Sequence, residues 1–235
     1  MNRFILFAFI LMMPLLIICS CENEVSFDIE YAVVSGKKIS RIKSGDTRIY
    51  EFSYDECGRV RNTQYLDAET GKLIKTYNYF YAGNSITIKS DNSYGDAVLT
   101  FDDQGKIINM SAYDAEYVMS YSDNSELTMI TYNGGPYCHY VWDDGNVVIM
   151  TEYLRDFTEE SHFEYSNIID NFNVQLPHVS WFASHANKQE IELADVRSTY
   201  LVSRYGTNVY EYTRNSEGDI DKVICNDWVY YIEYQ

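Results

Sequence analysis

We predict an all-β fold in which an antiparallel meander of repeated hairpins forms a large twisted or curved sheet. Two observations lead to this prediction. Aromatic and polar residues alternate with a period of two over long stretches, for example at Tyr50, Phe52 and Tyr54, and this pattern is typical of half-buried antiparallel strands. A turn motif built on Asp or Asn and Gly recurs between such stretches. Typical strand and turn lengths suggest roughly ten to fourteen strands.

The first 20 residues are predicted to be a secretion signal. They contain one cation, Arg3, followed by an uncharged and almost wholly apolar run over residues 4–18. That run is shorter than the ~20 residues of a membrane-spanning helix, and the acidic residues Glu22 and Glu24 follow it in place of a basic cluster. A cleaved signal peptide therefore explains the segment better than a permanent transmembrane anchor.

The end of this signal resembles the lipobox of bacterial lipoproteins. Ile18, Cys19, Ser20 and Cys21 supply, in order, an aliphatic residue, a tolerant position, a small residue and the cysteine that is acylated. Cys19 fits the acylated position poorly, because bulky Ile18 would precede it where only small side chains are accepted. The resemblance implies a lipidated Cys21, and the alternative is an ordinary signal peptide cut nearby. Two or three acyl chains, at ~0.8 kcal/mol per buried methylene, would hold the protein on a membrane.

These features divide the chain into three parts. Residues 1–20 are the signal peptide, residues 21–26 are the lipidated tether, and residues 27–235 form a single β domain. A β unit of about 200 residues can bury a proper core as one domain. Glu22 and Glu24 resemble the acidic surface-export signal of Bacteroides-type lipoproteins. We therefore expect an outer-membrane lipoprotein of the cell envelope that faces either the surface or the periplasm.

The net charge of −17 disfavours phosphate-rich partners. The chain has 18 basic and 35 acidic residues, and no stripe of Lys or Arg offsets the excess. Nucleic acid and anionic lipid would both be repelled by such a surface. The predicted contact with a membrane is therefore the lipid on Cys21, and no nucleic-acid partner is expected.

A hairpin motif is repeated in the body of the chain. Phe52–Val60 reads F-S-Y-D-E-C-G-R-V and Leu99–Ile107 reads L-T-F-D-D-Q-G-K-I, while Tyr140–Val147 is one residue shorter and Tyr212–Ile220 has Asn in place of Asp. In each copy, Asp or Asn caps the turn with a side-chain oxygen, and Gly takes a positive φ before a β-branched residue restarts pairing. The predicted turn residues are Asp55, Gly58, Asp102, Gly105, Asp143, Gly145, Asn215 and Gly218. No helix follows these glycines, so they are not a phosphate-binding set.

The alternation weakens after Glu152 and is interrupted over residues 170–197. This part contains Pro177 and several Asn residues, followed by a segment from about Asn187 to Val196 that could form a short helix. We interpret it as one irregular connection that covers an edge or an end of the sheet. Residues 198–235 return to the strand pattern.

These motifs resemble Bacteroides-type lipoproteins that are catalogued only as a domain of unknown function, the 4595 family. The matching features are the lipobox, the repeated hairpin, the W-x-D-G-N-V string at Trp142–Val147, the N-x-x-L-P stretch at Asn173–Pro177 and the closing Y-E-Y at Tyr210–Tyr212. They cover most of residues 45–235. More distantly, the hairpins are similar to tyrosine-aspartate (YD/RHS-type) repeats of bacterial surface shells, although the copies here are few and irregularly spaced. The family has no established activity, so the resemblance implies no catalytic residues.

The sequence contains no recognisable motif for a metal, a cofactor or a catalytic nucleophile. There is no H-E-x-x-H motif and no nucleophile elbow, and the histidines are scattered at His139, His162, His178 and His185. The body of the chain also has Cys57, Cys138 and Cys225, which permit at most one disulfide and have no metal-site spacing. We therefore predict no cofactor and no metal, and we name no catalytic residue.

The 23 tyrosines are the main indication of function. So many rings cannot all reach one core, and those left at a surface offer flat apolar area with a hydroxyl group. We therefore expect a lipid-anchored, non-enzymatic module that binds a glycan, a peptide or another envelope protein. Tyrosine is also simply a good strand former, which leaves this interpretation open. The alternative is a hydrolase that acts on polysaccharide or peptidoglycan through two carboxylates, which 35 acidic residues neither exclude nor locate.

Overall fold

The computed structural model describes residues 38–91, 96–112, 115–169 and 200–235. The strands in these ranges are β1 (Ile39–Ser44), β2 (Arg48–Tyr54), β3 (Val60–Asp67), β4 (Leu73–Ala82), β5 (Ser85–Ser90), β6 (Ala97–Phe101), β7 (Ile107–Ala112), β8 (Ala115–Tyr121), β9 (Leu127–Tyr132), β10 (Gly135–Asp143), β11 (Asn146–Tyr153), β12 (Thr158–Ile169), β13 (Tyr200–Tyr205), β14 (Asn208–Arg214), β15 (Ile220–Cys225) and β16 (Trp228–Tyr234). No helix that could cross a membrane occurs among the described residues. The predicted signal peptide, Cys21, the irregular connection and its short helix lie outside the described ranges.

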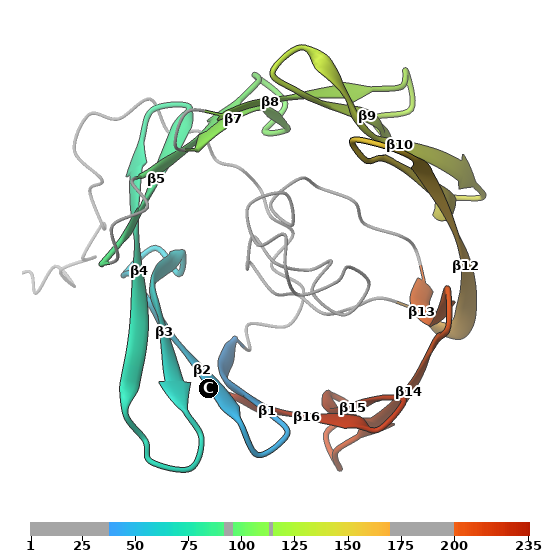
Figure 1. The fold of residues 1–235 in the computed structure, drawn as a ribbon. Helices are drawn as coiled ribbons and strands as arrows, with labels where there is room; N and C mark the ends of the chain where they lie inside the picture. The colour runs from blue at the N-terminus through green and yellow to red at the C-terminus, as the bar shows by residue number, and fades with distance from the viewer. Residues whose placement is uncertain (1–37, 92–95, 113–114, 170–199) are drawn as a thin grey trace, which may run out of the picture.

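The strands form a closed barrel (Figure 1). Each strand pairs antiparallel with its neighbours in sequence, and β16 pairs with β1 to complete the ring. At the closing seam Ile42 faces Ile232, and Lys38 and Gln235 exchange backbone hydrogen bonds of 3.2 and 2.8 Å. The prediction of an all-β antiparallel meander of hairpins is confirmed.

The closure of the sheet corrects the sequence prediction. We expected a large twisted or curved sheet with roughly ten to fourteen strands, whereas the described residues form 16 strands without a free edge. Alternation identifies strands and their faces, but it contains no information on whether the first and last strands meet. Tight turns such as Asp144–Gly145 also use less chain than typical turns do, which leaves residues for more strands.

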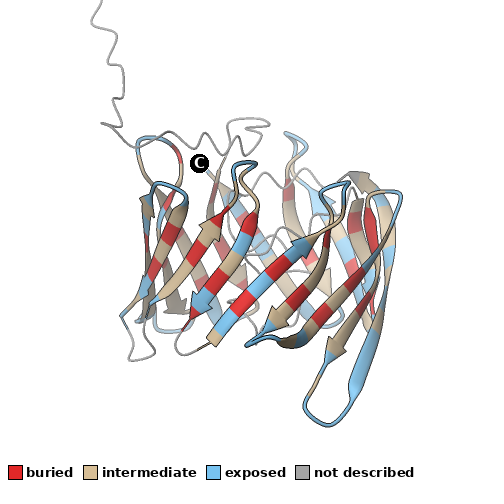
Figure 2. Ribbon diagram, turned by 90° about the horizontal axis from the view of Figure 1, so that it is seen from above, coloured by how far each residue is buried: buried red, intermediate tan, exposed pale blue. Residues whose placement is uncertain are grey.

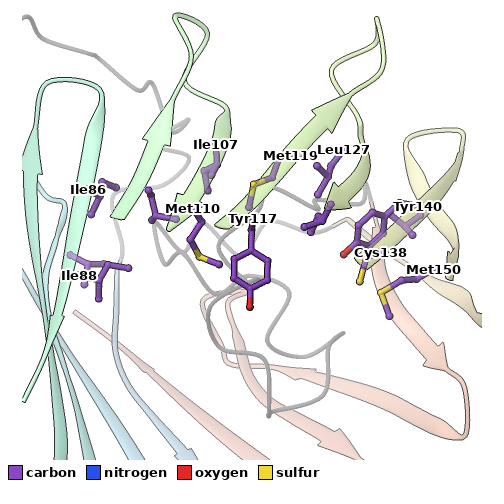
Figure 3. Close-up of a cluster of buried hydrophobic side chains, with 14 of the residues drawn as sticks. Ile86, Ile88, Ile107, Met110, Tyr117, Met119, Leu127, Cys138, Tyr140 and Met150 are labelled. Carbon is purple, nitrogen blue, oxygen red and sulfur yellow. The ribbon is translucent and has the colours of Figure 1, made fainter. Parts of the chain in front are cut away.

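Most of the buried side chains lie on the inner face of the barrel. Buried and exposed residues alternate along the strands, as the red and pale blue bands in Figure 2 show. In β8, for example, Tyr117 and Met119 are buried whereas Val118 and Ser120 are exposed. The labelled side chains of β5 to β11 lie together on one side of the wall (Figure 3). These side chains, for example Ile86, Ile88 and Tyr117, point into the ring, so the buried side is the concave one (Figure 3).

The inner wall is largely apolar. Its largest side chains with less than 2 % exposure are Phe101, Ile39, Leu99, Met110, Leu127, Ile130, Val60, Val147 and Val223. Full burial of one such side chain contributes about 1.5 to 3 kcal/mol relative to exposure. The wall is therefore the hydrophobic core of the described barrel, and this core extends around almost the whole ring.

The outer wall carries pairs of oppositely charged side chains from neighbouring strands. The guanidinium of Arg41 lies 3.4 Å from a carboxylate oxygen of Glu233 and 3.6 Å from one of Glu51. Arg204 and Glu164 form another pair, with 3.5 Å between nitrogen and oxygen. Exposed pairs of this kind contribute only about 0 to 1 kcal/mol each. They place charged groups on the outer wall, beside exposed apolar side chains such as Phe80, Val118 and Val141.

The turns fall into two sets because successive strands run in opposite directions. We call one set the motif rim; it consists of the turns β2–β3, β4–β5, β6–β7, β8–β9, β10–β11 and β14–β15. We call the other set the opposite rim; it includes the turns β1–β2, β3–β4, β7–β8, β9–β10, β11–β12, β13–β14 and β15–β16. All four copies of the sequence motif lie at the motif rim.

Aromatic side chains hold the open ends of the hairpins together at the motif rim. In each hairpin, the ring at the end of the second strand donates a hydrogen bond to a backbone carbonyl near the start of the first. The pairs are Tyr54–Ile39, Tyr81–Val60, Tyr121–Ile107, Trp142–Leu127, Tyr165–Val147, Tyr212–Val202 and Tyr234–Ile220. In the remaining hairpin, β5–β6, Phe101 has no hydroxyl group, and Asn84 Nδ2 donates to the Phe101 carbonyl at 3.2 Å.

This arrangement accounts for the Arg or Lys that follows the motif glycine in the first two copies, at Arg59 and Lys106. Tyr81 Oη donates to the carbonyl of Val60 at 2.9 Å, and the guanidinium carbon of the preceding Arg59 lies 4.3 Å from the centre of the same ring. Lys106 Nζ lies 5.3 Å from the ring centre of Tyr121 in the corresponding place. Such cation–π contacts contribute about 0.5 to 1 kcal/mol at exposed sites. The repeated motif is therefore accounted for by packing between hairpins.

Candidate functional site

The turn residues named from the sequence have structural contacts at the motif rim. Positive φ angles occur at Gly58 (81°), Gly105 (78°), Gly145 (71°) and Gly218 (91°), in the region that favours glycine. Asp102 Oδ1 accepts hydrogen bonds from the backbone N–H groups of Gln104 and Lys106, both at 2.9 Å. Asp55 and Asn215 accept equivalent bonds from the residues four positions later, at 2.8 and 3.0 Å. These oxygens are occupied by the backbone and do not form a ligand site.

The third copy of the motif makes a tighter turn. Asp143 pairs with Asn146 across Asp144 and Gly145, whose φ angles are 47° and 71°. Two successive positive φ angles are typical of a two-residue hairpin turn of type I′. Asn146 Nδ2 donates to the Asp144 carbonyl at 3.0 Å. The missing residue of this copy therefore changes the turn type without changing the rim on which it lies.

The described residues do not bring metal-binding or redox groups together. They contain no group of three or more His, Cys, Asp or Glu that could hold a metal ion. Cys57 is exposed, Cys138 is buried and Cys225 is half-buried, and no two of these three described cysteines form a disulfide with each other. His139 and His162 alternate with inward-facing neighbours and so lie on the outer wall, whereas His178 and His185 lie outside the described ranges.

Three tyrosines of the inner wall form a cluster beside the opposite rim, which we call the Tyr132 cluster. Tyr117 and Tyr132 face each other across β8 and β9, and Tyr137 follows at a bulge in β10. The ring centres of Tyr117 lie 5.1 Å from Tyr132 and 5.9 Å from Tyr137. The rings are tilted or edge-on, and Tyr132 is 43 % exposed. Tyr117 itself is buried, so the exposed apolar area of this cluster is on Tyr132.

A second cluster on the inner wall, which we call the Arg48 cluster, combines tyrosines with cations. Tyr50 and Tyr65 face each other across β2 and β3, and their rings stack with centres 5.2 Å apart and planes at 15°. Arg48 Cζ lies 5.8 Å from the ring centre of Tyr65, and Lys75 Nζ lies 4.2 Å from that of Tyr77. Lys75 is opposite Tyr65 in the β3–β4 register, so all five side chains share the inner face.

The guanidinium of Arg48 has no carboxylate partner among the described residues. Asp67 is opposite Arg48 in the β2–β3 register, but its Oδ1 accepts hydrogen bonds from Thr70 Oγ1 at 2.6 Å and from Thr70 N at 2.8 Å. These hydrogen bonds from Thr70 lower the pKa of the Asp67 carboxyl. Arg48 itself forms no ion pair within the described part of the chain, and its side chain is exposed.

The two clusters lie on facing sides of the ring, because β2 to β4 and β8 to β10 are on opposite arcs in Figure 1. Both are next to the opposite rim. The sequence predicted a tyrosine-lined face but not these residues. The alternation placed Tyr50 on the same face as Phe52, but only the strand register brings Tyr50 to Tyr65 and Tyr117 to Tyr132.

Two carboxylates are also neighbours on the inner wall. Glu152 and Glu159 face each other across β11 and β12, and Glu152 faces the buried Cys138 on its other side. Glu159 is exposed and Glu152 is half-buried. The directly opposite position brings Cβ atoms to about 4.5 to 5.5 Å. This is the one place in the described barrel where the register pairs two inward carboxylates directly.

Several tyrosine hydroxyls of the inner wall are held in the neutral form by burial. Burial raises the pKa of Tyr79 to about 12, despite a hydrogen bond with Thr63 that acts in the other direction. Burial also raises the pKa of Tyr140 and of Tyr210. Near neutral pH these rings are therefore uncharged, and the cations of the inner wall are not offset by tyrosinate.

The described residues thus define an up-and-down antiparallel barrel of 16 strands. Among solved structures, the chain is similar to a porin-like protein from Bacteroides uniformis, with a TM-score of 0.63 and 14% identity over 84% of this chain and 96% of that one. It is also similar to a porin-like protein from Bacteroides vulgatus, with a TM-score of 0.55 and 14% identity over 84% of this chain and 99% of that one. At this identity the likeness establishes the fold alone.

A weaker likeness, with a TM-score of 0.32, links 81% of this chain to 12% of a chain in the Photorhabdus luminescens Tc holotoxin pore. No family model and no curated protein matches the sequence. The resemblance to the 4595 family therefore stays a prediction from the sequence.

Proposed function

We propose that this chain is a lipid-anchored protein of the cell envelope whose barrel binds a glycan or a peptide on its inner wall, without catalysis. The observation that supports this most directly is the pair of tyrosine clusters on a concave surface. Aromatic rings supply flat apolar area and hydroxyl groups at a low cost in side-chain entropy. A concave wall presents such rings to one molecule from several sides, which a flat sheet does not.

The charged pairs on the outer wall support a barrel that stands in water. Arg or Lys facing lipid near the middle of a bilayer costs about 2 to 4 kcal/mol. Arg41 and Arg204 occupy outward positions, and the residues that alternate with them face inward. In the proposed arrangement the acyl chains on Cys21, and not the strands, attach the protein to the outer membrane. The two Bacteroides proteins of similar fold are described as porin-like.

Attachment is tested by substitution of the two cysteines in cells that express the full chain. Cys21→Ala should give unprocessed precursor or released protein, whereas Cys19→Ala should stay membrane-bound. Fractionation and metabolic labelling with a fatty acid measure both outcomes. If both variants stay processed and membrane-associated, lipidation at Cys21 is wrong. Protease treatment of intact cells then distinguishes a surface-exposed barrel from a periplasmic one.

Binding is tested with the purified full chain against envelope polysaccharides, oligosaccharides and peptides, by calorimetry or tyrosine fluorescence. The double variant Tyr65→Ala with Tyr132→Ala should weaken binding at least about tenfold, because each ring supplies contact area. Tyr231→Ala is the matched control, since this outward tyrosine is 48% exposed. Binding that the inner variant leaves unchanged, or that the control weakens equally, contradicts an inner-wall site.

A hydrolase remains the second candidate because Glu152 and Glu159 are paired on the inner wall. A retaining glycosidase needs two carboxyl groups about 5 to 5.5 Å apart, one of them protonated. Two aromatic clusters lie on the same wall, against this single carboxylate pair, and for this reason we prefer the binding function. Release of reducing sugar from a polysaccharide, lost in both Glu152→Gln and Glu159→Gln, would reverse this preference.

A further inference from the structure

We infer that the barrel rests with its opposite rim on the surface of the lipid bilayer that holds its anchor, without spanning that bilayer. This inference rests on the lipid attachment in the proposed function and adds a second contact with the membrane. It starts from exposed large apolar side chains at one end of the barrel. Leu73, Ile74, Tyr132, Tyr153, Phe157 and Trp228 lie in a turn of the opposite rim or within two residues of one, and we call them the rim residues.

The motif rim presents much less apolar surface. By the same criterion, Ile108 is the one exposed large apolar residue at the motif rim among the described residues. Aromatic rings do occur there, but residues such as Tyr54 and Tyr121 are half-buried and donate hydrogen bonds to backbone carbonyls. The rim residues are 36 to 61 % exposed. The two ends of the barrel therefore differ in the apolar surface that they present to a partner.

The rim residues are spread around the mouth of the barrel. Leu73 and Ile74 are on β4, and Tyr132 is on β9, on another arc of the ring (Figure 1). Phe157 precedes β12 and Trp228 begins β16, which complete the circuit. A small ligand cannot contact all of these side chains together, whereas a flat surface wider than the barrel can. Trp and Tyr rings, with an apolar body and a polar edge, suit the boundary between lipid headgroups and acyl chains.

Trp228 shows how such a ring is presented at the rim. A Cβ added to Gly45, in the β1–β2 turn, would lie 3.6 Å from two carbon atoms of the Trp228 ring. The ring is thus supported by the neighbouring turn, and 53 % of the residue stays exposed. Trp228 is therefore a natural probe of whatever the rim contacts.

The charges of the two rims favour the same orientation. Every described turn of the motif rim except residues 83–84 carries at least one Asp or Glu. At the opposite rim, the turns at residues 133–134 and 206–207 are uncharged, and Lys72 and Arg155 accompany the carboxylates of their own turns. An acidic surface is repelled by anionic lipid. Of the two rims, the opposite rim is the one that can approach a bilayer without this repulsion.

The proposed anchor leaves this orientation open to the barrel. Lys38, where the described chain begins, lies at the motif rim beside Gln235. Residues 22–37 connect it to Cys21, and at about 3.3 Å per residue they can span at most about 53 Å. The longest strand, β12, has 12 residues and so spans about 40 Å. The tether can therefore pass along the wall, and an anchored barrel needs only a weak rim contact to stay seated.

The experiment uses the full chain, expressed in cells, purified with its acyl chains and reconstituted into phosphatidylcholine vesicles. The lipid tails are brominated in one sample and unmodified in the other, because bromine quenches only nearby tryptophan. Trp228 is followed in a variant with Trp142→Phe and Trp181→Phe. We expect brominated lipid to remove at least about half of its emission, since groups seated at the interface lie about 5 to 10 Å deep at the headgroup–acyl boundary.

The matched probe is Trp142 at the motif rim, followed in a variant with Trp181→Phe and Trp228→Phe. It should keep its emission, since the strands hold the motif rim away from the lipid tails. Thermal melts show whether each variant is folded. If Trp142→Phe prevents folding, the quenching of Trp228 is obtained as the difference between the wild-type chain and Trp228→Phe.

Charge placed at the rim tests the contact itself. Ile74→Asp combined with Phe157→Asp should lower the quenching of Trp228 at least about twofold, because carboxylates oppose burial at the interface. The matched control is Phe80→Asp combined with Val118→Asp. Phe80 is on the same strand as Ile74 and equally exposed, at 52 % against 51 %, but it lies on the outer wall. The control should leave the quenching unchanged.

A chain that stays on the vesicles while Trp228 is not quenched would overturn the inference and leave the proposed anchoring intact. Stronger quenching of Trp142 than of Trp228 would overturn it by placing the motif rim at the membrane. Self-association in sedimentation, lost in the Ile74→Asp and Phe157→Asp variant while Trp228 stays unquenched, would assign the rim to a second copy of the chain. If the wild-type chain carries no acyl chain and does not stay with the vesicles, the proposed anchoring fails together with this inference.

Discussion

The two rims of the barrel use tyrosine in different ways. At the motif rim, Tyr121 donates its hydroxyl to the Ile107 carbonyl, and Lys106 covers the ring. At the opposite rim, Tyr117 and Tyr132 contact each other, and Tyr132 is 43 % exposed. The aromatic residues of the repeated motif are thus explained by packing between hairpins. Binding is better sought among the tyrosines that lie outside the motif, which is where both inner-wall clusters occur.

The largest effect should come from alkaline pH, because it acts on many buried hydroxyls at once. Burial raises the pKa of Tyr54 and Tyr234 at the motif rim and raises that of Tyr79 to about 12. Tyrosines of the unfolded chain ionise near pH 10, so between about pH 10 and 12 the unfolded state has released protons that the folded state keeps. Stability is therefore complete below about pH 10 and falls above it, by about 1.4 kcal/mol per pH unit for each such tyrosine.

Urea unfolding at a series of pH values, followed together with tyrosinate absorbance, measures this dependence. Ionisation should accompany unfolding as one cooperative step. A folded barrel that titrates all its tyrosines near pH 10, with unchanged stability, would contradict the burial of the motif-rim hydroxyls.

A matched pair of hydroxyl deletions tests the contrast between the rims directly. Tyr121→Phe removes the donor to the Ile107 carbonyl, whose bond measures 2.7 Å, and should cost about 1 to 3 kcal/mol because that carbonyl loses its partner. Tyr132→Phe at the opposite rim should change the free energy of unfolding by less than about 0.5 kcal/mol, since this ring is largely exposed. Equal losses in the free energy of unfolding for the two variants would contradict the distinction between the hydrogen-bonded tyrosines of the motif rim and the exposed Tyr132.

Backbone strain should not distinguish the rims. Gly218 at the motif rim and Gly206 at the opposite rim have φ angles of 91° and 56°, and an added Cβ would meet nothing within 4 Å at either position. Gly218→Val and Gly206→Val should each cost about 1 to 3 kcal/mol, from the conformation alone. Thermal melts of both variants measure this loss of stability. A variant that melts like the wild-type protein would show that its turn does not need a positive φ.

The smallest effect should come from the side chains that cap the turns. Asp102→Ala removes an oxygen that accepts two backbone N–H groups and should cost about 0.5 to 1.5 kcal/mol. Asp46→Ala at the opposite rim removes only an exposed partner of Lys43, at 3.6 Å, and should stay within about 0.5 kcal/mol of wild type. Urea unfolding of the two variants measures how much each side chain contributes to the free energy of unfolding. A cost for Asp46→Ala as large as that for Asp102→Ala would mean that capping is not confined to the motif.

The sequence by itself determined the class of fold and the local structure of the repeats. Period-two alternation at Tyr50, Phe52 and Tyr54 depends only on the geometry of a single strand, so it identified strands, and the residues that share a face, without any knowledge of partners. The motif around Asp102 and Gly105 is likewise local, because its hydrogen bonds join residues two to four positions apart. Antiparallel order followed from these turns, since a tight turn can only join antiparallel neighbours.

Only the tertiary structure decided the closure of the barrel, the separation of the rims and the candidate site. The seam pairs Ile42 with Ile232, a contact between the two ends of the described chain that no local pattern encodes. The strand register, which depends on the length of every turn, decides that Tyr50 meets Tyr65 and that Arg48 lies beside them. A pattern of period two shows which face a side chain takes, whereas its neighbours on that face are determined by how the strands align.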